Sequence, residues 1–143
     1  MKYGKWLAIA LCVYVGIVGA FESLIGFLQP AGEDTLVITT TDSEGNASDR
    51  VLARLESSGQ LYVAANHWPR AWYEQALEDP KVEVTLAGET SPYLAVPVTD
   101  VEHDRLAVEH STGTVFRILT GFPPRYFLRL DPRSESSAAP PKG

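Results

Sequence analysis

The stretch Asn66–Val84, NHWPRAWYEQALEDPKVEV, joins one strand pattern to a helix pattern and then to a second strand pattern. Pro69 suits the first turn of a helix, because the amide hydrogen that proline lacks would have no partner there. The helical pattern ends at Asp79-Pro80. Alternation of valine with polar residues resumes at Val82, which is typical of a strand. This segment therefore predicts a short helix between two strands.

Strand patterns also lie on both sides of this segment. They cover residues 35–41, 50–56, 61–65, 93–98 and 126–130. In the second run we expect Val51, Ala53 and Leu55 to form the apolar face. Pro92 and Pro97 favour an edge strand or a bulge for the run at 93–98.

A second short helix is predicted from about residue 101 to 110, opened by a capping box at 99–102. Residues 111–124 show no clear pattern. Six strands with two inserted helices, and no βαβ alternation, predict a mainly β fold, a closed or split six-stranded antiparallel barrel.

The N-terminal run Trp6–Leu28 is about 23 residues long and carries a single charge, so it can cross a hydrocarbon layer. Lys2 and Lys5 precede this run, and it predicts a membrane anchor helix. A cleaved signal peptide is the alternative, because Val18-Gly19-Ala20 resembles a cleavage site. The predicted organisation is an anchor at 1–29, a barrel domain at 30–133 and a disordered tail at 134–143.

The sidedness of the membrane is open. Basic residues before the apolar run and the acidic Glu33 and Asp34 after it place the body outside the cytoplasm by the positive-inside rule. A helix that lies along the inner leaflet, with the body inside, is the alternative.

Composition excludes several functions. The net charge of −6 argues against a nucleic-acid surface. The only cysteine, Cys12, lies in the apolar run, so it forms no disulfide or thiolate metal site within the chain. The three histidines lack metal-binding spacing, and the common nucleotide-binding and hydrolase motifs are absent. We therefore expect no metal.

TLVITTT, LYVAAN and PRAWYEQALEDPKVEVTLAGET resemble the deazaflavin-dependent nitroreductase family over roughly residues 35–98. The resemblance rests on Trp72-Tyr73, Pro80, Val82 and Val84. Family members have a split-barrel fold related to flavin-binding pyridoxamine-phosphate-oxidase-like proteins. Where they commonly carry a basic Gly-Arg-Lys-Ser-Gly turn, this chain has the acidic DSEGN at 42–46.

The resemblance implies an 8-hydroxy-5-deazaflavin cofactor, with FMN as the alternative. A helix N-terminus near Arg70 and nearby arginines could hold a phosphate, and aromatic residues could stack on the ring. For Trp72, a core position is an equal alternative. Solvated side chains are the alternative for the two strand arginines. The cofactor-binding candidates are Arg50, Arg54, Asn66, His67, Trp68, Arg70, Trp72 and Tyr73.

The function that this resemblance implies is hydride transfer from the reduced deazaflavin to a quinone, nitroaromatic or similar small electrophile, by an enzyme anchored in the cell membrane. The alternative is a non-enzymatic, membrane-tethered barrel that binds a flavin, a haem or a protein partner. The acidic hairpin favours the binding protein, and the Trp-Tyr helix favours the enzyme. Split barrels of this class often form homodimers, and no stretch specifies an interface.

Overall fold

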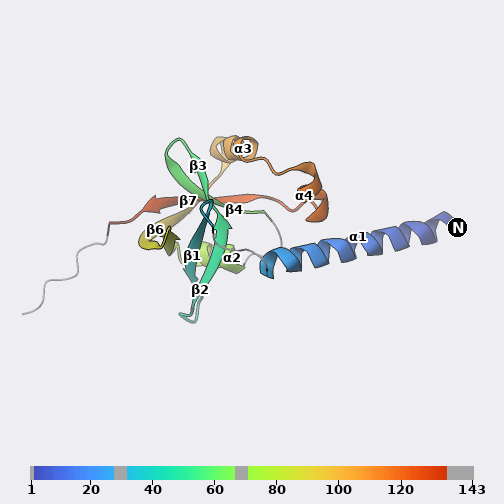
Figure 1. Cartoon of the computed structure of the whole chain (residues 1–143), viewed down its shortest axis with the longest axis horizontal. Coiled ribbons are helices and arrows are strands. Elements are labelled where there is room, and N and C mark those ends of the chain that lie inside the picture. The colour runs from blue at the N-terminus through green and yellow to red at the C-terminus, as the bar shows by residue number, and fades with distance from the viewer. Residues whose placement is uncertain (1, 28–31, 67–70, 135–143) are drawn as a thin grey trace, which may run out of the picture.

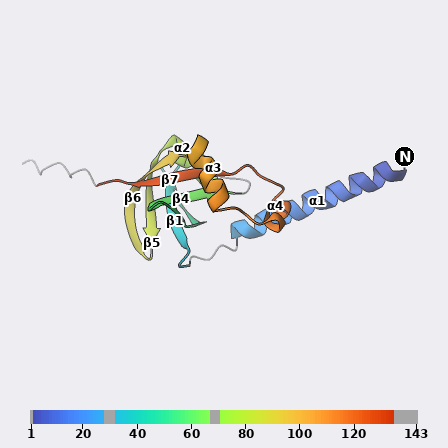
Figure 2. The ribbon, with the colours of Figure 1, turned by 90° about the horizontal axis from the view of Figure 1, so that it is seen from above.

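The computed structural model describes residues 2–27, 32–66 and 71–134, and in two views helix α1 points away from a β-sheet body (Figures 1 and 2). The helices are α1 (Lys2–Phe27), α2 (Ala71–Glu78), α3 (Asp100–Glu109) and α4 (Thr114–Leu119). The strands are β1 (Thr35–Thr41), β2 (Ala47–Ala53), β3 (Leu55–Ser57), β4 (Gln60–Ala65), β5 (Lys81–Leu86), β6 (Glu89–Pro97) and β7 (Tyr126–Pro132). Of the predicted tail at 134–143, all but Ser134 lies outside the described residues.

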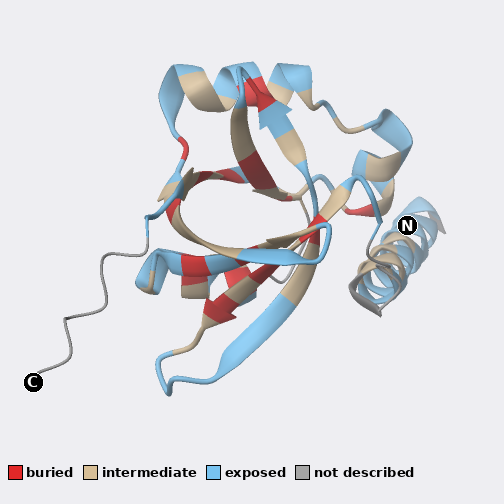
Figure 3. Cartoon of the chain, turned by 60° about the vertical axis from the view of Figure 1, so that its left-hand side comes forward, coloured by how far each residue is buried: buried red, intermediate tan, exposed pale blue. Residues whose placement is uncertain are grey.

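All seven strands form one antiparallel sheet in the order β2-β1-β5-β6-β7-β4-β3. Its two outermost strands, β2 and β3, are separated in the chain by Arg54 alone. Because one residue cannot span a flat seven-stranded sheet, the sheet must curl until its two edges approach. The result is a curled half-barrel, visible in Figure 3.

The predicted barrel is confirmed in its mainly β, antiparallel character, but the strand number differs. The run at 50–56, predicted as one strand, is divided at Arg54 into the end of β2 and the whole of β3. The predicted apolar face is also wrong, because Leu52 is the buried residue of β2 and Ala53 is exposed. The alternation of side chains along β2 has the predicted two-residue period, but the face buried in the fold is the one opposite to the face that we expected.

The prolines of β6 favoured an edge strand or a bulge, and of these the edge is wrong, because β6 lies between β5 and β7. Pro92 pairs opposite β5 and lies just beyond the β7 ladder, whereas Pro97 pairs opposite β7 and lies beyond the β5 ladder. Each proline therefore has a strand neighbour on one side only. Proline has no N–H to donate to a neighbouring strand, and this is tolerated because on one side of each proline there is no paired strand that needs the hydrogen bond.

The main core lies inside the curled sheet and under α2. Trp72 and Ala76 are buried there among aliphatic residues of β1, β4, β5 and β7. Gln75, on the same helix, accepts a hydrogen bond from the buried Thr40 hydroxyl at 2.7 Å, so the polar contact between α2 and β1 is satisfied. Apolar burial and this bond fix α2 across the sheet.

Helix α3 covers the other face of β4 and β7 through an ion-pair network. Glu102 accepts a hydrogen bond from the Tyr62 hydroxyl at 2.7 Å and pairs with Arg129 at 3.2 Å. Arg129 also pairs with Asp131 at 2.8 Å. Because Glu102 is used in this way and Thr99 makes no side-chain cap, the predicted capping box does not form.

Helix α1 includes a candidate membrane span, Tyr3–Ile25, of 23 residues. None of its most apolar window is buried in the structure, so this helix contributes to no protein core. By length and composition the helix can cross a membrane, and a signal sequence would pass the same test.

Candidate functional site

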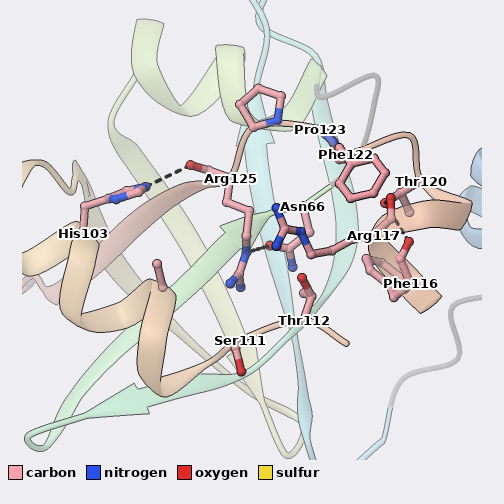
Figure 4. A pocket seen from close by; sticks show the side chains of 12 residues that line it. Asn66, His103, Ser111, Thr112, Phe116, Arg117, Thr120, Phe122, Pro123 and Arg125 are labelled. Carbon is pink, nitrogen blue, oxygen red and sulfur yellow. Dashed lines mark hydrogen bonds between the residues drawn. The ribbon is translucent and has the colours of Figure 1, made fainter. Parts of the chain in front are cut away.

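A cavity of about 420 Å³ lies between α3, α4 and the segment that leads into β7 (Figure 4). Asn66 directly follows β4, Arg125 directly precedes β7, and both side chains line the cavity. The β4–β7 register pairs Ala65 with Tyr126 and so brings these two side chains together. Antiparallel pairing thus joins residues almost sixty positions apart in the chain.

Arg125 is held by three contacts. Its Nε donates a hydrogen bond to the Asn66 Oδ1 at 2.7 Å, and its guanidinium lies over the Phe127 ring at 4.9 Å from the centroid. Its backbone carbonyl accepts a hydrogen bond from the His103 Nε2 at 3.0 Å. Since a carbonyl can only accept, His103 carries a proton on Nε2. The guanidinium is therefore fixed in position before any ligand binds.

Arg117 brings a second guanidinium to the cavity from α4, where it lies 5.4 Å from the Phe122 ring centroid. Burial lowers the pKa of Arg125, and the nearby positive charge of Arg117 lowers it further. Among the described residues that line the cavity there is no aspartate or glutamate. Two cations without a lining carboxylate form a site suited to an anion such as a phosphate.

The remaining cavity wall combines flat apolar surface with hydroxyl groups. Phe116 and Phe122 supply rings, and Ser111 and Thr112 supply hydroxyls (Figure 4). The Thr120 hydroxyl is used internally, since it donates to the Phe116 carbonyl at 2.8 Å and helps to end α4. Small-molecule sites usually combine apolar walls with a few fixed polar groups, and this cavity has both.

Of the five candidate residues that the structure describes, Asn66 alone lines this cavity. Trp72 is 6% exposed and belongs to the core. Tyr73 is half-buried, with its ring 5.4 Å from that of Tyr126. Tyr126 and Arg125 are neighbours in sequence but contact opposite sides of the sheet, so the aromatic residues of α2 face away from the cavity.

The two strand arginines also lie elsewhere. Arg50 is half-buried on β2, and Arg54 is exposed and paired with Glu56 through its Nε at 2.8 Å. Arg54 lines a different cavity, of about 460 Å³, which also contains Glu33. The candidates His67, Trp68 and Arg70 lie outside the described residues.

Sequence reasoning missed Arg117 and Arg125 because residues 111–124 had no periodic pattern. One signal was present. Phe122-Pro-Pro-Arg125 places a basic residue directly after two prolines and before a strand, where loops commonly carry functional side chains. Among the described residues, no group of three His, Cys, Asp or Glu side chains gathers as a metal site.

No protein-family profile and no curated protein matches the chain. Solved structures do match. A structure described as a domain-swapped dimer aligns with a TM-score of 0.57 at 19% identity, over 73% of this chain and 84% of the other. An F420-H2 dependent reductase, FDR-A, aligns with a TM-score of 0.50 at 19% identity, over 71% of this chain and 98% of the other.

A pyridoxamine 5'-phosphate oxidase-related, FMN binding protein from Nostoc punctiforme aligns with a TM-score of 0.51 at 17% identity, over 84% of this chain and 78% of the other. At such identities the comparison is one of folds. The chain therefore has the split-barrel architecture seen in these proteins, of which one is named for F420-H2 and another for FMN.

Proposed function

We propose that the protein is a membrane-anchored oxidoreductase that binds a phosphate-bearing cofactor of the flavin type. The observation that carries this proposal is the cavity in which Arg117 and Arg125 converge with no carboxylate among the described lining residues. Fold neighbours that use F420-H2 or FMN support the broad class. The deazaflavin, 8-hydroxy-5-deazaflavin, is the cofactor that the sequence resemblance favours, and FMN is the alternative.

The residues of the cavity fit such a group. Arg117 and Arg125 would hold the phosphate, and the Asn66 amide would keep Arg125 in place. Phe116, which also lines the cavity, would provide a flat wall for the ring system. When bound, the reduced cofactor supplies a hydride. The protein's own part is to position the reactants and exclude water, so no catalytic acid is needed among the lining residues.

The proposed acceptor is a small electrophile such as a quinone or a nitroaromatic compound. A homodimer is also proposed, supported by the neighbour described as a domain-swapped dimer. A non-enzymatic binding protein is favoured by one feature, the β1–β2 turn. There Asp42 accepts backbone hydrogen bonds from Glu44 and Asn46 at 2.9 Å each. The family that the sequence resembles commonly carries a basic Gly-Arg-Lys-Ser-Gly turn at this place.

Titration of the full-length protein in detergent micelles, with oxidised and reduced deazaflavin and with FMN, tests the proposal. Ring absorbance and fluorescence report binding. One of the two cofactors should bind with a Kd well below about 1 mM, which corresponds to a binding free energy of more than roughly 4 kcal/mol. This binding should weaken as the salt concentration is raised. If neither ring binds in that range, the enzyme is excluded and the binding protein remains. Oxidation of the bound reduced cofactor by a small quinone then checks the hydride transfer.

A further inference from the structure

Helix α4 packs against α1, although about one hundred residues separate them. The Tyr14 hydroxyl donates a hydrogen bond to the Ile118 carbonyl at 2.8 Å. The Phe21 and Phe116 rings meet edge to face at 6.1 Å. Gly121 lies so close to α1 that a Cβ added to it would approach the Val18 Cγ1 to 3.2 Å. Figures 1 and 2 both show α4 beside α1.

These contacts set the position of α4 along the candidate membrane span. Tyr14 is the middle residue of the span Tyr3–Ile25, and Phe21 lies four residues from its body-proximal end. At 1.5 Å per residue, the contacts run from about 6 Å to about 16 Å inside that end. A helix that touches α1 over this interval lies at the depth of the membrane rather than above it.

Three large apolar side chains are exposed on α4 and on the turn that follows it. Val115 is 71% exposed, Ile118 is 44% exposed, and Phe122, which follows the helix, is 55% exposed. These residues adjoin the apolar surface of α1, which is itself exposed to solvent in the structure. Two contiguous apolar surfaces exceed what a soluble protein normally leaves uncovered and fit a lipid environment.

We propose that α4 and the Gly121–Phe122 turn are a second membrane-contacting element, which inserts Val115, Ile118 and Phe122 into the body-proximal leaflet beside α1. The occupant of this surface is the acyl-chain region of a lipid bilayer. Because α4 also forms a wall of the Arg117–Arg125 cavity, this cavity would open at the membrane surface. The inference rests on the proposed anchoring of α1.

Site-specific fluorescence on the full-length protein tests the inference. Native Cys12 is exposed on α1 and reports insertion of the anchor. In a Cys12→Ser background, Val115→Cys reports α4. Val108→Cys on α3 is the matched control, because this valine is 78% exposed and belongs to the adjacent helix. Each variant is labelled with an environment-sensitive dye and placed in phosphatidylcholine–phosphatidylglycerol vesicles that contain acyl-chain nitroxide lipids.

We expect the labels at Cys12 and at position 115 to shift to shorter emission wavelengths and to lose most of their intensity, while the label at position 108 keeps its intensity. If Cys12 is quenched and position 115 behaves like position 108, the inference on α4 is overturned and the anchor stands. If Cys12 is not quenched, the anchor itself fails, and the inference fails with it. Equal quenching at all three positions would indicate adsorption of the whole body and would also overturn the inference.

Discussion

The two helical sides of the barrel differ in their polar content. On the α2 side, Trp72 and Ala76 are buried among aliphatic strand residues. On the α3–α4 side, a smaller apolar cluster that includes Leu106 and Phe127 lies beside the Tyr62–Glu102–Arg129 network and the Arg125 cavity. The aromatic-rich segment of the sequence therefore stabilises the fold, whereas the segment without a pattern forms the candidate site.

Within the charged side, two arginines four residues apart sharpen the contrast. Arg125 and Arg129 contact the same side of the sheet, yet Arg129 pairs with Glu102 and Asp131, while Arg125 is held by the neutral Asn66. A charge that is compensated within the protein has a structural role. A fixed charge that faces a cavity with no lining carboxylate among the described residues is available to a ligand.

The largest expected effect is at Trp72. Trp72→Ala should lower the free energy of unfolding by about 3 to 5 kcal/mol, because it removes a buried aromatic side chain from the core. Urea or thermal denaturation measures the loss. Leu77→Ala, on the same helix but 46% exposed, is the matched control and should cost much less. A stable Trp72→Ala variant with weakened cofactor binding would instead place this residue in the binding site.

Arg125→Ala should weaken cofactor binding by about 1.5 to 3 kcal/mol, the scale of hydrogen bonds to a charged group. Its effect on unfolding should be smaller, about 1 kcal/mol, because the Asn66 amide and one cation–π contact lose a partner. Titration with the cofactor at several salt concentrations measures the affinity. Arg54→Ala is the control from the other cavity. If Arg54→Ala weakens binding and Arg125→Ala does not, the phosphate site is assigned to the wrong cavity.

Arg129→Ala should show the reverse pattern. It leaves Glu102 and Asp131 without their shared cation in a partly buried setting, which should cost about 1 to 2 kcal/mol of stability and leave cofactor affinity unchanged. Arg105→Ala removes an exposed pair with Glu109 and should have little effect. Equal losses of affinity in the Arg125 and Arg129 variants would remove the distinction between the two arginines.

The smallest effect is a pH dependence at Tyr62. Burial raises the pKa of its hydroxyl, and the hydrogen bond to Glu102 raises it further. The folded state therefore holds this proton more tightly than the unfolded state. Stability from this group is present below the unfolded pKa of about 10 and is lost as pH rises through the folded pKa. Tyr62→Phe should cost about 1 kcal/mol at neutral pH.

The difference in unfolding free energy between parent and Tyr62→Phe should narrow as pH is raised above about 10, since the variant has no proton to lose at this position. Denaturant titrations of both proteins across this range provide the measurement. A constant difference would show that the Tyr62 hydroxyl ionises alike in the folded and unfolded states.

The sequence by itself determined the apolar N-terminal helix, the predominance of short strands, and the helix at 71–78 between two of them. These features follow from local periods of apolar residues, which a reader of the sequence can count. The resemblance over residues 35–98 also predicted the split-barrel architecture that the fold comparison supports.

Only the tertiary structure decided which face of β2 is buried, that Arg54 divides β2 from β3, and that β6 lies inside the sheet despite its prolines. It alone brought Asn66 to Arg125 and α4 to α1. The physical reason is that these outcomes depend on pairing between residues far apart in the chain. Local periodicity fixes the spacing of side chains along an element, but the partner strand or helix decides which of them meet.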